Sequence, residues 1–155
     1  MVEWQLTIDT NDPRGQVRFW GPVLGYEPQP PPAGHATWND YYLSVGVPAD
    51  ELDLTGDGQD RIQDPTGAGP RIWFQFVPEP KAGKSRLHLD VYVPYAGPPG
   101  PKRTALVEAR VAELVVAGAT VLRRYPADFD VEDSSGHSFV VLADPDGNEF
   151  CVSAR

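Results

Sequence analysis

The start of the chain alternates hydrophobic and polar residues with a period of two. Its hydrophobic positions are Val2, Trp4, Leu6 and Ile8, and its polar positions are Glu3, Gln5, Thr7 and Asp9. This period places the two sets on opposite faces of a β-strand. Residues 86–93 repeat the alternation, with Arg86, His88, Asp90 and Tyr92 on the polar face. Composition and spacing predict further strands at residues 35–47, 71–78, 120–125, 137–144 and 149–154.

Two other stretches have the spacing of an α-helix. Residues 104–117 carry hydrophobic side chains three and four positions apart, and Gly118 suits the left-handed conformation that ends a helix. An earlier helix begins after Asp12, an N-cap residue, with Pro13 at its first position. We expect that helix to be short or kinked, because Pro22 removes a backbone donor.

The predicted elements occur twice in the same order, namely strand, helix and then strands. This order predicts an α+β fold of two βαβββ modules, residues 1–80 and 85–155, within a single domain of 155 residues. Two such modules form a half-open, curled β-sheet barrel with flanking helices, and the concave face of the barrel can hold a ligand.

The charge of the chain argues against two classes of partner. Thirteen basic and 22 acidic residues give a formal net charge of −9, which repels a phosphate backbone or an anionic bilayer. No stretch approaches the roughly 20 apolar residues of a membrane span, and the first residues do not have the pattern of a signal peptide. We therefore expect a cytoplasmic protein that binds neither nucleic acid nor membranes.

Several motifs of known chemistry are absent or incomplete. The sequence contains no Gly-x-Ser-x-Gly motif of a serine hydrolase and no glycine-rich phosphate loop before a helix. Asp53, Asp57 and Asp60 cluster around two glycines, but their spacing is not that of a calcium-binding EF-hand. We interpret this segment as a solvated acidic loop.

Four tryptophans, Trp4, Trp20, Trp38 and Trp73, all fall in the first module. Trp20 has the position of a core residue on the first helix. Trp4 or Trp73 could instead form the wall of a cavity for a flat apolar or aromatic ligand.

Three segments, FWGPVLGYE, FVPEPKAGKSRLHLDV and DPDGNEFCV, resemble the glyoxalase and bleomycin-resistance group, also called the vicinal oxygen chelate superfamily. The resemblance is to its glyoxalase-like branch of small bacterial proteins, and it is loose only between about residues 28 and 69. It implies the paired βαβββ fold predicted above and a small-molecule ligand or substrate. It is also consistent with a homodimer.

The resemblance implies a divalent metal on the concave face, such as zinc, manganese, nickel or iron. The family's ligand positions fall on Gln5, on Trp73 or Gln75, on His88, and on Cys151, where the family has a glutamate. Glu149 lies two residues nearer the turn, at the rim. Because the carboxylate ligand is missing, the resemblance is consistent with either no metal or one divalent metal.

Cys151 and His88 each have alternative roles. Cys151, the single cysteine, is a small packing residue in the favoured interpretation, and otherwise a metal ligand or a reactive thiol. His88 could be a metal ligand, a catalytic base or a hydrogen-bonded wall residue, and Asp90 could orient its ring. We expect His35 and His137 to lie on the surface.

Two functions follow from these alternatives. The first is a protein that binds a small molecule in its concave cavity, without an intact metal site. The predicted cavity residues are Gln5, Thr7, Trp73, Gln75, His88, Asp90 and Cys151. The second is a metal-dependent lyase, isomerase or dioxygenase, with His88 catalytic and Gln5, His88 and Cys151 holding the metal.

Overall fold

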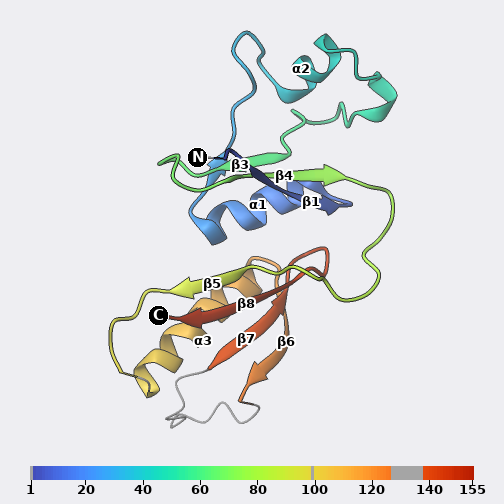
Figure 1. The fold of residues 1–155 in the computed structure, drawn as a ribbon. Coiled ribbons are helices and arrows are strands. Elements are labelled where there is room, and N and C mark those ends of the chain that lie inside the picture. Colours follow the sequence, from blue (N-terminus) through green and yellow to red (C-terminus); the bar gives the residue numbers. More distant parts are fainter. Residues whose placement is uncertain (1, 99, 127–137) are drawn as a thin grey trace. The chain divides into compact units, whose positions relative to one another are not determined.

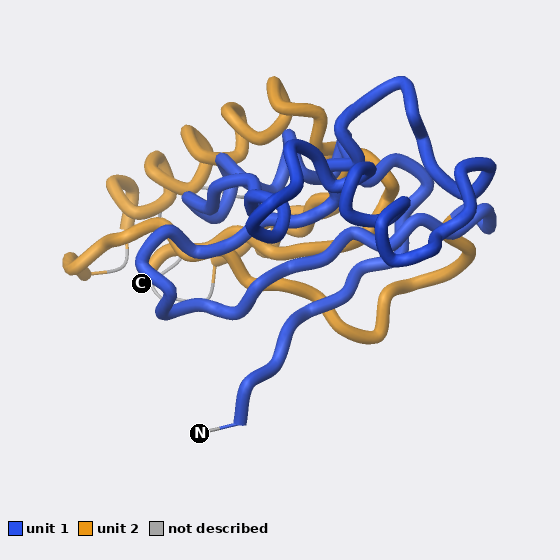
Figure 2. Tube along the Cα trace, turned by 90° about the horizontal axis from the view of Figure 1, so that it is seen from above, with its two compact units in different colours: residues 1–80 blue, residues 81–155 orange. Residues whose placement is uncertain are grey.

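The chain forms two compact units, Met1–Pro80 and Lys81–Arg155, each with its own four-stranded sheet (Figure 2). The computed structural model describes residues 2–98, 100–126 and 138–155. Both sheets are open rather than closed barrels, and helices accompany each of them, so the predicted α+β class is confirmed. The association of both units into one domain of 155 residues stays a prediction.

Unit 1 begins with a strand and a helix, as the sequence predicts (Figure 1). Its elements are β1 (Gln5–Thr10), α1 (Pro13–Leu24), β2 (Glu27–Pro28), α2 (Trp38–Ser44), the short 3-10 helix η1 (Ala49–Glu51), β3 (Arg61–Gln63) and β4 (Arg71–Phe76). The sheet order is β1-β4-β3-β2, with β1 parallel to β4 and the other pairs antiparallel.

Helix α1 starts where its cap predicts. The carboxylate of Asp12 accepts a 2.8 Å hydrogen bond from the backbone N–H of Gly15, and Pro13 takes the first helical position. The helix continues through Pro22 and ends at Gly25, whose φ of 68° is the left-handed conformation that glycine adopts without strain. Val17, Trp20 and Val23 of α1 are buried, and with residues of the sheet they form the core of unit 1.

The predicted strand at residues 35–47 is wrong, because this segment contains helix α2. Thr37 accepts a 3.0 Å hydrogen bond from the N–H of Asp40, and Asp40 accepts one of 3.0 Å from the N–H of Thr37. This reciprocal capping box satisfies two backbone donors that would otherwise have no partner at the start of a helix. Local capping therefore outweighs the strand propensity of the aromatic residues that follow.

Unit 2 repeats the strand order of unit 1. Its elements are β5 (Asp90–Val93), α3 (Pro101–Val116), β6 (Thr120–Tyr125), β7 (Phe139–Ala143) and β8 (Glu149–Ala154). The order is β5-β8-β7-β6, with β5 parallel to β8. Several predicted boundaries shift: β5 starts four residues later than expected, and α3 starts three residues earlier. Part of the predicted strand at 137–144, including His137, lies outside the described residues.

One face of the second sheet packs against α3. Val107, Val111 and Leu114 of the helix are buried, as are Val140, Leu142, Phe150 and Val152 of the strands. Burying a side chain of this size contributes about 1.5–3 kcal/mol, and these residues form the hydrophobic core of unit 2. In the part of the chain that the structure describes, no helix has both the length and the apolar character needed to cross a membrane.

Candidate functional site

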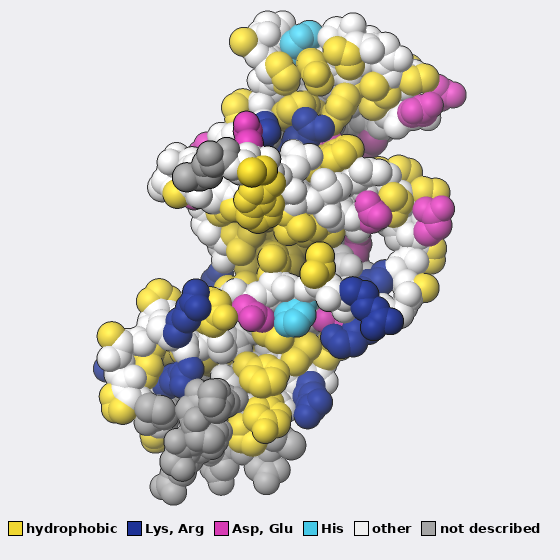
Figure 3. All heavy atoms as spheres, in the orientation of Figure 1, with side chains coloured by type: hydrophobic (Ala, Val, Ile, Leu, Met, Phe, Trp, Pro, Cys, Tyr) yellow, Lys and Arg dark blue, Asp and Glu magenta, His cyan; other side chains and the backbone are white. Residues whose placement is uncertain are grey.

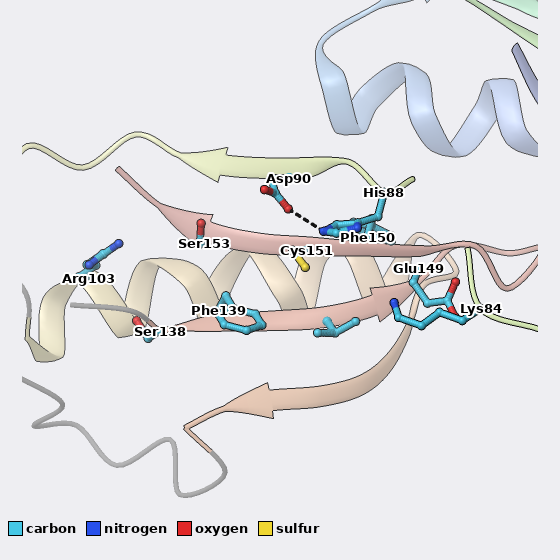
Figure 4. Close-up of a pocket in the computed structure, with 11 residues that line it drawn as sticks. Lys84, His88, Asp90, Arg103, Ser138, Phe139, Glu149, Phe150, Cys151 and Ser153 are labelled. Atoms are coloured by element: carbon cyan, nitrogen blue, oxygen red, sulfur yellow. Dashed lines mark ion pairs between the residues drawn. The ribbon is translucent and has the colours of Figure 1, made fainter. Parts of the chain in front are cut away.

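Successive residues of β8 point to opposite faces of its sheet. Phe150 and Val152 are buried on the face toward α3, whereas Glu149, Cys151 and Ser153 are half-buried on the other face. That open face forms the floor of a cavity of about 500 Å³, shown in Figure 4. Phe139 and Val141 of β7 supply apolar walls.

Three different donor groups meet in this cavity. Asp90 lies beside Cys151 in the parallel register of β5 and β8, and His88 stands two residues before Asp90. The His88 Nε2 lies 3.5 Å from Asp90 Oδ1, and one ligand atom from each of His88, Asp90 and Cys151 lies within 4.8 Å of the others. An imidazole, a carboxylate and a thiolate are the donor types of catalytic zinc sites with three protein ligands.

The surroundings of Cys151 favour its thiol over its thiolate. Burial raises the pKa of Cys151, and the negative charge of Asp90 and a hydrogen bond with it raise that pKa further. A raised pKa lowers the thiolate fraction at neutral pH, and the thiolate is the form that reacts or binds metal. The reactive-thiol interpretation therefore gains no support from this environment.

Charged side chains border the cavity at both ends. Lys84 and Arg103 lie at opposite ends in Figure 4, and the Arg103 guanidinium donates to the carbonyl oxygen of Ala154. Glu149 accepts a 2.9 Å hydrogen bond from the N–H of Ser85 and forms a 3.1 Å ion pair with Lys81. The Ser85 hydrogen bonds, followed by the Lys81 contact, lower the pKa of Glu149 to about 2. Glu149 therefore anchors the segment before β5.

The predicted site residues of unit 1 do not all lie at one cavity. Gln5 and Thr7 are exposed on β1, and neither lines the cavity just described nor a second cavity in unit 1. Trp73 and Gln75 of β4 do line that second cavity, which has a volume of about 890 Å³. The structure thus brings His88, Asp90 and Cys151 together, while the part of Gln5 in a metal site with them stays a prediction.

Two other predictions about aromatic and histidine residues have an outcome. Trp4 is 63% exposed and lines neither cavity, so Trp73 is the tryptophan at a cavity wall. His35 is half-buried and packs edge-to-face against Tyr41, with ring centroids 5.4 Å apart. His137 lies outside the described residues.

A half-buried polar cluster in unit 1 was not predicted from the sequence. The Oδ2 atom of Asp60 accepts hydrogen bonds from the Tyr42 hydroxyl, at 2.7 Å, and from Trp73 Nε1, at 2.8 Å. The Arg61 Nε lies 3.4 Å from Asp60 Oδ1, and the Arg61 guanidinium covers the Trp38 ring at 4.2 Å. Burial raises the pKa of Asp60.

The interpretation of Asp53 to Asp60 as a solvated loop is therefore wrong at Asp60. Tyr42, which binds Asp60, stands 18 positions away in the sequence. No local pattern of the segment indicates this contact. Asp53 and Asp57 do fit a surface loop, because each is exposed and accepts hydrogen bonds from neighbouring backbone N–H groups.

Comparison with known proteins identifies a family. The sequence model of the glyoxalase-like domain family matches residues 5–153. None of the curated proteins compared with the chain matches its sequence significantly.

Solved structures share the fold at low sequence identity. Protein PA1353 from Pseudomonas aeruginosa has 15% identity and a TM-score of 0.56, with 100% of this chain and 98% of that chain covered. A glyoxalase/bleomycin resistance protein/dioxygenase family enzyme from Burkholderia phytofirmans has 18% identity, a TM-score of 0.53 and coverages of 97% and 95%. A glyoxalase-related enzyme from Fulvimarina pelagi has 17% identity, a TM-score of 0.51 and coverages of 100% and 88%.

Proposed function

This chain belongs to the glyoxalase-like domain family, and we propose that it binds a small organic molecule on the open face of the sheet of unit 2, without a tightly held divalent metal. The observation that carries the proposal is the convergence of His88, Asp90 and Cys151 on one cavity of about 500 Å³. A concave site of this size, with apolar walls and a few convergent polar groups, is typical of small-molecule binding.

Each group around the cavity has a defined part in such binding. The contact of His88 Nε2 with Asp90 orients the His88 ring, which can then hydrogen-bond an oxygen or nitrogen of the ligand. Phe139 and Val141 provide apolar contact, and Lys84 and Arg103 provide positive charge at the two ends. We propose that a ligand with an apolar body and polar groups at its ends fits this arrangement.

The donor set argues against tight metal binding. Cys151 stands where the family resemblance expects a glutamate, and a thiol must lose its proton before it can ligate a metal. Burial and Asp90 raise the pKa of Cys151, so forming the metal-binding thiolate costs more here than at an unperturbed thiol.

A second candidate function is supported by the same geometry. Donor atoms of His88, Asp90 and Cys151 within 4.8 Å of one another could hold zinc or another borderline metal and leave a coordination position for substrate. Such a metal would polarise a carbonyl group or activate oxygen, as in a lyase, an isomerase or a dioxygenase. His88, Asp90 and Cys151 would then fix the position of that metal on the open face of the sheet.

The metal content of protein purified without a metal-affinity tag distinguishes the two functions. We expect less than one metal per chain as purified, and only weak binding of zinc, manganese, nickel or iron(II) on titration. The variants Cys151→Ala and Asp90→Asn test the donor set. Ser153→Ala, on the same face of β8, is the matched control. One metal per chain that is lost in both donor variants and kept in Ser153→Ala would establish the second function.

Thermal stabilisation by a panel of small aromatic compounds tests binding itself. We expect at least one compound to raise Tm in the parent protein but not in Val141→Trp, where the larger side chain fills the cavity while leaving the three donor groups in place. Absence of both metal and ligand binding would overturn the proposal. A cytoplasmic location and a homodimer stay predictions.

A further inference from the structure

Unit 1 contains a cavity of its own, with a volume of about 890 Å³. It lies between the end of β4, the turn from β1 into α1, and the connection that runs through α2 and η1 to β3. The family resemblance is loose in this connection, whereas Trp73 and Gln75 of β4 fall at a family ligand position, so the lining combines both kinds of residue. We propose that the cavity binds an organic cation with a flat aromatic body.

Aromatic side chains form one wall of the cavity. Tyr42 comes from α2, and Trp73 and Phe76 come from β4. Asp60 fixes two of them, because its carboxylate accepts both the Tyr42 hydroxyl and the Trp73 indole N–H. Phe76 is 60% exposed, so its ring is available to a ligand. Rings that are already held in place lose little conformational freedom on binding.

Asn39 of α2 holds another part of the cavity lining in place through hydrogen bonds. Its side-chain amide donates to the carbonyl oxygens of Asp53 and Gly56, both at 2.9 Å. The backbone N–H of Asn39 donates to the carbonyl of Asp57 at 3.1 Å. Three hydrogen bonds from one buried residue therefore hold the loop after η1 against α2.

The charge of the lining selects the class of ligand. Five acidic residues line the cavity, namely Asp12, Asp50, Glu51, Asp53 and Asp60, against one basic residue, Arg14. Arg61 lies against Asp60 and offsets its charge, whereas Asp50 and Glu51 are exposed on η1. Figure 3 shows acidic side chains beside hydrophobic ones in the segment beyond α2. Carboxylates beside aromatic faces favour a cation with an aromatic body, through charge attraction and cation–π contact.

Three probes of similar shape and different charge test the inference. These are N-methylacridinium, which is a cation, acridine, which is neutral at pH 8, and anthracene-9-carboxylate, which is an anion. Tryptophan fluorescence quenching and calorimetry give the affinities at low salt. We expect the cation to bind at least about tenfold more tightly than acridine, and the anion to bind most weakly. Added salt should reduce the affinity for the cation more than the affinity for acridine.

Variants assign the binding to this cavity. Phe76→Ala should lower the affinity for both the cation and acridine by about tenfold, since the lost ring contact serves both. Asp50→Asn combined with Glu51→Gln should lower only the affinity for the cation. Asp9→Asn is the matched control, because Asp9 is an exposed carboxylate of β1 that does not line the cavity.

The result that overturns the inference is equal affinity for the three probes, no binding of any of them, or no effect of the cavity variants. Val141→Trp in unit 2 separates this inference from the proposed function. If that variant abolishes probe binding while Phe76→Ala does not, the probe occupies the cavity of unit 2. The inference then fails while the proposed function gains support.

Discussion

The two sheets have the same strand order and the same parallel pair, yet equivalent positions on their open faces carry different chemistry. In unit 1 the third residue of β4, Trp73, pairs with Thr7. In unit 2 the third residue of β8, Cys151, pairs with Asp90. Counting along the strands therefore places Trp73 and Cys151 at equivalent positions.

The surroundings of these two positions differ as much as the side chains. The connection before β3 brings Tyr42 and Asp60 to Trp73, and hydrogen bonds fix the indole there. Around Cys151 the neighbours are His88 and Asp90, which are partly exposed to solvent. The comparison shows that the shared topology places one side chain at the same position of each sheet. The identity of that side chain and the connection before β3 make the face in unit 1 a hydrogen-bonded aromatic wall. In unit 2 the same position belongs to a solvent-accessible set of donor groups.

The largest loss of stability is expected from substituting the residues that directly follow Trp73 and Cys151. Phe74 and Val152 are both fully buried, as the fourth residues of β4 and β8. Phe74→Ala should lower the free energy of unfolding by about 4 kcal/mol and Val152→Ala by about 2 kcal/mol, because the larger deletion leaves the larger cavity. Urea unfolding measures both, with the exposed Val116→Ala as the control. An equal cost for both substitutions would contradict this expectation and would show that the two cores relax differently around the deleted side chains.

Substitutions at the equivalent positions Trp73 and Cys151 should change the free energy of unfolding by smaller amounts. Trp73→Phe removes the indole N–H that binds Asp60 and should cost about 1–2 kcal/mol, since a half-buried carboxylate loses a donor. Cys151→Val nearly conserves volume and should change stability by less than about 1 kcal/mol. Urea unfolding of both variants checks the contrast. A destabilised Cys151→Val with an unaffected Trp73→Phe would reverse the roles assigned to the two sites.

A pH-dependent contribution is expected at the first position of β8. The pKa of Glu149 is lowered from 4.5 to about 2 in the folded chain, so the ionised carboxylate stabilises the fold above pH 4.5. This contribution is lost as pH falls from 4.5 toward 2. Glu149→Gln should therefore be less stable than the parent protein at pH 7, and the gap should close across that interval.

Urea unfolding of Glu149→Gln at several pH values between 2 and 7 measures this gap, with the exposed Glu3→Gln as the control. A gap that does not change with pH would mean that packing, rather than charge, explains the loss.

The smallest effect is expected at Arg71, the first residue of β4 and thus the counterpart of Glu149. Arg71 forms an ion pair with Glu3 at an N–O distance of 3.4 Å. This pair is exposed, because 48% of the Arg71 side chain and 88% of the Glu3 side chain are accessible to solvent. Arg71→Ala should change the free energy of unfolding by less than about 0.5 kcal/mol, and salt should reduce even that. A loss above about 1 kcal/mol would indicate that unit 1 depends on this residue for packing.

Much of the fold could be predicted from the hydrophobic periodicity and the capping residues of the sequence. Alternation identifies β1, Asp12 and Pro13 mark the start of α1, and helical spacing identifies α3. These signals are local, so a single sequence carries them. The start of α2 was also marked, by Thr37 and Asp40 three residues apart, but the aromatic residues after them suggested a strand.

The sites depend on contacts that local patterns do not contain. His88 and Asp90 share a face by their spacing, and the resemblance pointed to Cys151. The burial of Asp60 depends on Tyr42 and Trp73, which come from other elements of unit 1. Its role could therefore not be predicted from the acidic segment around it, which resembles any solvated loop.

The parallel pairing in each sheet has a consequence for how the chain folds. Gln5 pairs with Arg71 and Asp90 with Cys151, so the loops to be closed span 66 residues (71 − 5) and 61 residues (151 − 90). Closing loops of this length costs chain entropy before the contacts between the strands offset it. The β7–β8 hairpin needs only the tight turn at Gly147, and hairpins form within about 1–10 μs. We therefore expect the hairpin that carries Cys151 to form early. Asp90 should pair with Cys151 only in the last, slower step of folding.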